Sequence, residues 1–183
     1  MLKDVLVEYC APTLAGLKTG NIISVRNDDS ENIDEEIRDL NRVFAEKGLR
    51  LIPLRRTDRQ VMVYLYRPKQ LKKDLTNPEA HHILENKGYP CDDSECCVAR
   101  LRKNLTNDSD FPHEIGLFLG YPPEDVRDFM DNPCKKAKCI GCWKVYNNEV
   151  EARKTFDKFD RCRRLYRSFA KSGRSIETLV VGT

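Results

Sequence analysis

Four cysteines in the last third of the chain have a spacing that suits a metal site. Cys134, Cys139 and Cys142 read C-x4-C-x2-C, and Cys162 lies on the helix expected next. This spacing with a distant fourth cysteine is typical of plant-type iron–sulfur ligands, and C-x2-C is half of many structural zinc sites. Gly141 would permit the tight turn that aims two thiolates at one metal. The alternatives are isolated reduced thiols and a redox disulfide.

A second candidate is Cys10, which lies in the segment YCAPT. The sequence places it at the boundary of an element, before small residues and Gly16. Such a cysteine can expose its sulfur, and the backbone N–H groups around it can bind an anion. Lys18 and Thr19 follow closely and could bind the same anion. Cys10 is therefore a candidate nucleophile or ligand, and a buried thiol is the alternative.

The pair His113-Glu114 supplies a candidate base with a carboxylate beside it. If His113 meets Cys10 in space, the two form a thiol and a base, with Glu114 orienting the imidazole. The zinc-protease motif H-E-x-x-H is excluded, because position 117 is Leu. His113 could instead pack or cap a short helix. Arg67, at the end of an apolar strand, could bind an anionic ligand in the same pocket.

A further cysteine cluster, C-x4-C-C, lies near an expected helix start. Its members are Cys91, Cys96 and Cys97. The helical spacing of Cys97 with Leu101 and Leu105 places Cys97 in the core, and Cys96 is interpreted as incidental.

The hydrophobic pattern predicts an α+β fold in which strands and helices alternate irregularly. Strands are expected at 21–26, 49–56, 60–66 and 142–146. Helices are expected at 2–9, 33–48, 69–75, 78–87, about 94–105, within 111–120, from 123 to about 130, and at 149–171. The expected architecture is a single domain over 1–172: a mixed, mostly antiparallel sheet of about four strands covered by six or seven helices. Residues 173–183 are expected to form a mobile tail.

Composition narrows the class of protein. Charged residues make up 33 per cent of the 183 residues and the net charge is +3, which does not by itself indicate nucleic acid. No stretch approaches the ~18 apolar residues of a membrane helix, and the N-terminus does not resemble a signal peptide. We therefore expect a cytoplasmic protein that does not bind membranes. Its eight cysteines would be thiols or metal ligands rather than structural disulfides.

Four long motifs resemble the domain family of unknown function numbered 3793, and the resemblance covers nearly the whole chain. They are CAPTLAGLKTGN from Cys10, VYLYRP from Val63, FPHEIGLFLGYP from Phe111 and GCWKVY from Gly141. The resemblance implies a cytoplasmic protein of anaerobic bacteria, often encoded beside a flavodoxin, and hence a redox setting. The family's motif blocks correspond here to Cys10, Lys18, Arg67, His113, Glu114, Trp143 and Lys144. Family members often lack Cys134 and Cys139, which favours Cys10 over a metal site.

Three functions follow as hypotheses. The first is a redox or thiol-dependent enzyme that acts on a small anionic ligand, with Cys10, His113 and Glu114 as catalytic residues and a flavodoxin-like electron donor. Lys18, Thr19, Arg67, Trp143 and Lys144 would bind the ligand. The second is a non-enzymatic protein that binds an iron–sulfur cluster, zinc or haem. A third hypothesis is an interaction module that uses the basic face of helix 149–171, although acidic residues dilute that face.

Overall fold

The structure is a computed structural model that describes residues 2–26, 30–106 and 111–182. The chain divides into two compact units, which are treated separately below. Unit 1 contains Met1–Lys69 and Phe159–Thr183, and unit 2 contains Gln70–Lys158. The expectation of one globular domain over 1–172 stays a prediction.

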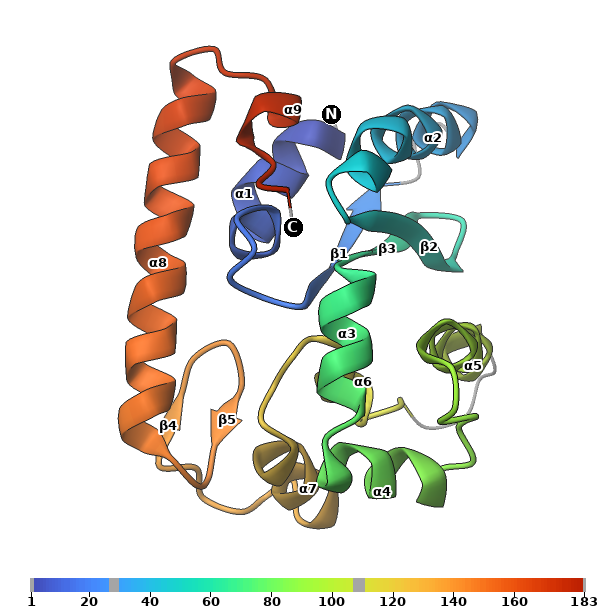
Figure 1. The fold of residues 1–183 in the computed structure, drawn as a ribbon, viewed down its shortest axis with the longest axis vertical. Helices are drawn as coiled ribbons and strands as arrows, with labels where there is room; N and C mark the ends of the chain where they lie inside the picture. Colours follow the sequence, from blue (N-terminus) through green and yellow to red (C-terminus); the bar gives the residue numbers. More distant parts are fainter. Residues whose placement is uncertain (1, 27–29, 107–110, 183) are drawn as a thin grey trace. The chain divides into compact units, whose positions relative to one another are not determined.

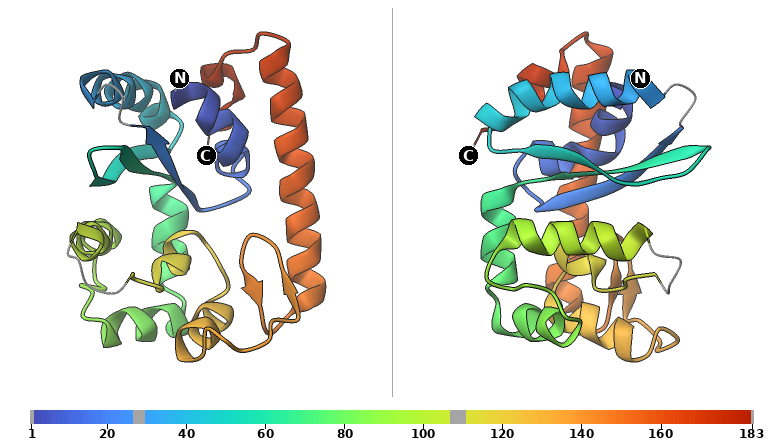
Figure 2. Two further views of the ribbon diagram at one scale, coloured as in Figure 1. Left: turned by 180° about the vertical axis from the view of Figure 1, so that it is seen from behind. Right: turned by 90° about the vertical axis from the view of Figure 1, so that its right-hand side faces the viewer.

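Unit 1 is built on a three-stranded antiparallel sheet (Figures 1 and 2). Its elements are α1 (Leu2–Leu14), β1 (Gly20–Arg26), α2 (Ser30–Glu46), β2 (Arg50–Arg56), β3 (Gln60–Tyr66), the later part of α8 (Glu149–Lys171) and α9 (Ile176–Leu179). The strand order is β1-β3-β2, with Ile23 opposite Val63. Pro53 lies on the edge strand β2 beside a bulge, which are the positions in a sheet where proline is tolerated.

The core of unit 1 lies between one face of the sheet and helices α1 and α2. Alternate residues of β3, beginning with Val61 and Val63, pack in one cluster with Leu6 of α1 and Phe44 of α2. The helical spacing of the apolar residues in α2 places them on this face, as the sequence predicts. Burial of this face drives the helix onto the sheet.

Two predictions about unit 1 are wrong. Helix α1 continues to Leu14 through Pro12, rather than ending at residue 9, because Pro12 is buried with its neighbours and packing offsets the missing N–H. The segment expected to be a mobile tail packs on the core. Its residues Ile176 and Leu179 are buried, and the Val181 N–H donates to the Leu14 carbonyl oxygen at 3.0 Å.

Unit 2 contains short helices and a two-stranded ribbon (Figure 1). Its elements are α3 (Pro68–Leu75, which begins in unit 1), α4 (Pro78–Asn86), α5 (Ser94–Thr106), α6 (Ile115–Phe118), α7 (Pro123–Asp131), β4 (Cys139–Ile140), β5 (Lys144–Val145) and the start of α8. The Asn77 side chain caps α4 by accepting from the N–H groups of Glu79 and Ala80, as the sequence suggests.

The α+β class is confirmed. The strands of the described residues form two sheets instead of one sheet of about four strands, because β4 and β5 pair only with each other. Within the same residues, the count of nine helices includes the four-residue α6 and α9. No helix in the described part of the chain combines the length and the apolar character needed to cross a membrane.

Candidate functional site

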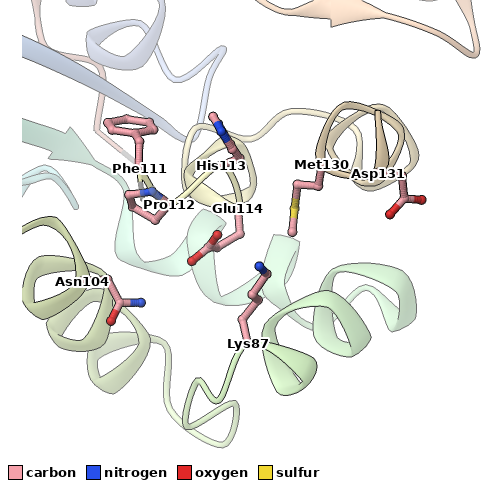
Figure 3. A pocket seen from close by; sticks show the side chains of 8 residues that line it. All are labelled: Lys87, Asn104, Phe111, Pro112, His113, Glu114, Met130 and Asp131. Carbon is pink, nitrogen blue, oxygen red and sulfur yellow. The ribbon is translucent and has the colours of Figure 1, made fainter. Parts of the chain in front are cut away.

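One candidate site is an open pocket of about 640 Å³ within unit 2 (Figure 3). Its lining comes from the ends of α4, α5 and α7 and from the segment before α6: Lys87, Asn104, Phe111, Pro112, His113, Glu114, Met130 and Asp131. Figure 3 shows the side chains of Lys87, Asn104, Glu114 and Met130 pointing toward the middle of the pocket. The rings of Phe111 and His113 lie at its rim and point away from Glu114.

Glu114 is a buried carboxylate at the wall of this pocket, with 4 per cent of its surface exposed. Its Oε1 accepts a hydrogen bond of 2.7 Å from the Tyr89 hydroxyl, and that hydroxyl accepts one of 3.2 Å from the Asn104 amide. Burial, reinforced by the bond to Glu114, raises the pKa of Tyr89, so the phenol keeps the proton that it donates. No described residue donates to the other oxygen, Oε2, although the carboxylate faces the pocket.

The end of α4 explains why Tyr89 points inward. Gly88 has a φ of +73°, which a glycine adopts without strain, and it stops the helix. The Tyr89 N–H then donates to the Leu84 carbonyl oxygen at 3.0 Å, and the Gly88 N–H donates to that of Glu85 at 2.9 Å. These two bonds form a Schellman motif, which reverses the chain at the helix end. The motif places the Tyr89 ring 5.8 Å from the Phe118 ring, in the interior of unit 2.

His113 lies beside Glu114 in sequence but is not oriented by it. The exposed imidazole packs against the rings of Phe129, at 5.1 Å, and Phe111, at 5.8 Å. The Glu114 carboxylate is instead bonded to Tyr89. The structure therefore offers no hydrogen bond for the predicted arrangement in which Glu114 orients His113 as a base.

Cys10 lies in the middle of α1 and not at an element boundary. Its side chain is completely buried among the apolar residues of unit 1. Burial raises the pKa of the thiol to about 12, against the opposing influence of the Lys18 ammonium. A thiol held protonated in a core is a poor nucleophile, because the thiolate is the reactive form. These surroundings favour a packing role for Cys10.

Arg67, a predicted anion ligand, is buried and bonded to the backbone of unit 1. Its Nε donates to the Thr13 carbonyl oxygen at 2.8 Å, and its Nη2 donates to those of Leu14 at 2.9 Å and Val181 at 2.7 Å. Two of these carbonyls belong to the last residues of α1. Carbonyls in the last turn of a helix lack an N–H donor within the helix itself. Arg67 thus caps α1 and holds the C-terminal segment. Thr19 is buried beside it, and its carbonyl accepts the Arg67 N–H at 2.9 Å.

Trp143 and Lys144, also predicted ligand residues, fix the β4–β5 ribbon. The Trp143 indole donates to Asp125 Oδ2 at 2.9 Å, and Asp125 Oδ1 accepts from the Tyr146 N–H at 2.9 Å. The Lys144 ammonium donates to the Pro133 carbonyl oxygen at 3.1 Å. The N–H and the side-chain amide of Asn147 also donate to Oδ1, each at 3.0 Å. The buried carboxylate of Asp125 therefore joins α7 to the ribbon.

The predicted metal ligands are divided between the two units. Cys134, Cys139 and Cys142 belong to unit 2, whereas Cys162 is packed in the core of unit 1. Among the described residues, no group of three or more His, Cys, Asp or Glu side chains is placed to hold a metal ion. Gly141 is needed for a different reason from the one expected: a Cβ there would lie 2.4 Å from the Phe156 ring.

Sequence reasoning did not single out three residues of this region: Tyr89, Asn104 and Asp125. Tyr89 directly follows the helix-stop signal Gly88, which could have indicated an inward-pointing side chain. Asn104 and Asp125 carry no signal of their own, because polar residues near helix ends are usually solvated.

The family model described as "Protein of unknown function (DUF3793)" matches residues 6–180. No curated protein and no solved structure shows a match to the chain.

Proposed function

The chain belongs to the family DUF3793, whose description states no activity, and we propose a function from the geometry of unit 2. The protein binds a small zwitterion in the pocket of this unit. The ligand would be an amino acid or a compound of similar size, held in the pocket of Glu114 and Lys87. The single observation that carries the proposal is the state of Glu114: a buried carboxylate that lines the pocket and that, among the described residues, accepts a hydrogen bond from Tyr89 at one oxygen only.

A buried carboxylate with so few donors is costly. An ionised group removed from water loses free energy unless hydrogen bonds or an opposite charge replace its hydration. No ion pair to Glu114 exists among the described residues, since its only bonded neighbour is Tyr89. An ammonium group in the pocket would supply a charge-assisted donor to Oε2. A bond of this kind contributes about 1.5–3 kcal/mol.

The rest of the lining supports a ligand that carries both charges. The Lys87 ammonium points into the pocket from the end of α4 and can bind a carboxylate. The Asn104 amide and the Met130 thioether point to the same space, so the ligand meets both a polar and an apolar surface. Phe111 and Pro112 add apolar area. The sequence predicts a small anionic ligand. The lining of the pocket supports a ligand that carries an amino group in addition to the anionic group.

The proposal uses neither Cys10 nor a metal. The Cys10 sulfur is buried in unit 1 with its pKa raised to about 12, so thiol-dependent catalysis there has no supporting observation. A flavodoxin-like electron donor stays a prediction. We place the protein in the cytoplasm, because all eight cysteines are free thiols and a reducing compartment keeps them so.

Thermal unfolding in the presence of individual amino acids tests the proposal. A ligand that binds only the folded state raises the melting temperature. We expect at least one amino acid at millimolar concentration to stabilise the wild-type chain. Glu114→Gln should weaken its apparent affinity roughly 10- to 150-fold, the equivalent of one charge-assisted bond. Lys87→Met should act in the same direction.

Glu124→Gln is the matched control, because Glu124 lies in the first turn of α7 but does not line the pocket. It should bind the amino acid as the wild type does. Stabilisation by no amino acid, or equal stabilisation of wild type and Glu114→Gln, would overturn the proposal.

A further inference from the structure

Two thiols of unit 2 are bonded to the turn that carries Tyr89, the residue that donates to Glu114 in the proposed pocket. Cys91 lies in the turn after α4, and Cys97 lies in the first turn of α5. The Cys91 thiol donates to the Tyr89 carbonyl oxygen at 3.4 Å, and the Cys97 thiol donates to that of Pro90 at 3.3 Å. The two sulfurs are therefore bound to successive carbonyls.

The surroundings distinguish these two thiols from their neighbour Cys96. Cys96 is exposed, and its thiol is bonded to the Asp93 carboxylate at 3.5 Å. Cys97 is buried, whereas Cys91 is half-buried and can be reached from solvent. A pair with one accessible and one buried sulfur, held on the carbonyls of adjacent residues in one turn, suits intramolecular disulfide formation, in which the accessible sulfur reacts first.

We propose that Cys91 and Cys97 are a redox pair that a peroxide converts to a disulfide. The Cys91 sulfur, as thiolate, attacks hydrogen peroxide, breaks its O–O bond and becomes a sulfenic acid, while the other oxygen leaves as water. The Cys97 sulfur then attacks the sulfenic sulfur, the S–S bond forms and the S–O bond breaks, releasing a second water. Two thiols thus lose two electrons and two protons, and the peroxide is reduced to two waters.

The two reduced thiols are protected from oxidation by peroxide at neutral pH. Burial raises the pKa of Cys97 to about 12, and burial followed by nearby carboxylates raises the pKa of Cys91. Groups with raised pKa values stay in the thiol form to a higher pH, so the thiolate needed for attack is scarce near pH 7. The reaction should therefore become faster as the pH rises, and the pair should stay reduced until peroxide accumulates.

Oxidation of the two thiols also affects the pocket, because it changes the turn that positions Tyr89. A disulfide removes both S–H donors from the carbonyls of Tyr89 and Pro90 and constrains the turn that positions the Tyr89 ring against Glu114. We infer that the oxidised form binds the zwitterion more weakly. This second step rests on the proposed function, whereas disulfide formation does not.

The test treats the full chain with hydrogen peroxide, alkylates the remaining thiols under denaturing conditions and identifies linked peptides by mass spectrometry. We expect a Cys91–Cys97 linkage in the wild type and in Cys96→Ser, and none in Cys91→Ser. The thermal melting of Cys91→Ser is measured beside the wild type, to confirm that the variant is folded. Alkylation of both Cys91 and Cys97 after treatment, or a linkage that uses Cys96, would overturn the redox pair.

Amino-acid binding is then compared between reduced and oxidised protein. Weaker binding after oxidation in the wild type, with no change in Cys91→Ser, is the expected result. A disulfide that forms without changing the binding overturns the link to the pocket and leaves the redox pair standing. If the reduced protein binds no amino acid, the proposed function fails, and the linkage experiment still decides the pair.

Discussion

Replacing Asp125 by Asn should destabilise unit 2 measurably, because one buried carboxylate accepts four hydrogen bonds. The donors are the Trp143 indole, the Tyr146 N–H, and two N–H groups of Asn147. Asn has the same shape but no charge, and its NH2 group would oppose one of these donors. The substitution therefore loses one bond outright and weakens the others.

The magnitude follows from these contacts. Hydrogen bonds to charged groups contribute about 1.5–3 kcal/mol, and neutral ones contribute about 0.5–1.5 kcal/mol. Losing one charged bond and reducing three others to the neutral value costs roughly 4.5–7.5 kcal/mol on this scale. Asn also avoids the cost of burying a charge, which offsets part of the loss. We expect a net loss of about 2 kcal/mol in the free energy of unfolding, or a fall of roughly 4–8 °C in melting temperature for a chain of this length.

The chain contains its own probe for this experiment. Trp143 is the only tryptophan, and its ring packs 4.6 Å from Phe156 in unit 2. Guanidinium unfolding followed by tryptophan fluorescence therefore reports on the site itself. Asp131→Asn is the control, since Asp131 lies on the same helix and is exposed. An unfolding midpoint for Asp125→Asn equal to that of Asp131→Asn would refute the reasoning.

Three further outcomes are expected in unit 1. Arg67→Met should cost about 3 kcal/mol in denaturant unfolding, because it removes three hydrogen bonds from a buried guanidinium to the carbonyls of Thr13, Leu14 and Val181; a midpoint equal to that of the wild type would contradict the capping role. Cys10 should react with a thiol reagent only after unfolding, whereas the exposed Cys96 reacts at once, as peptide mapping would show; equal rates would contradict the burial. The Lys3 ammonium, bonded to Glu177 at 2.7 Å, holds the pKa of that carboxyl at about 2. Since the folded pKa lies below the ordinary value near 4.5, this contribution to stability is present above about pH 4.5 and is lost as the pH falls toward 2. In acid titrations of stability, Lys3→Met should remove this component, and an unchanged acid profile would exclude it.

Much of the fold follows from periodicity alone. The α2 face that ends in Phe44 and the apolar strand β3 were predicted from their spacing, because burial of a continuous apolar face outweighs local details. The α1 helix was not, because a proline argues locally against a helix and only tertiary packing overrides it. The C-terminal segment was missed for the same reason. Its few apolar residues give no long periodic pattern, and the buried Arg67 that binds it lies 114 residues away in sequence.

The candidate site was predicted only in part. His113 and Glu114 line the pocket, but the bond that defines Glu114 comes from Tyr89, 25 residues earlier. No local spacing encodes that contact, because it depends on how the end of α4 meets the segment before α6. For Cys10 the local sequence was misleading. The segment suggests a reactive thiol, but Cys10 lies on the buried face of α1. Residue type indicates chemistry, whereas burial and partners decide whether that chemistry is available.

The most direct measurement is a crystal structure of the full chain with the amino acid that stabilises it most. We predict the ligand's ammonium nitrogen at about 3 Å from Glu114 Oε2, with the Tyr89 bond to Oε1 preserved. Its carboxylate should lie against the Lys87 ammonium. A ligand bound elsewhere, or one whose carboxylate approaches Glu114, would contradict the account.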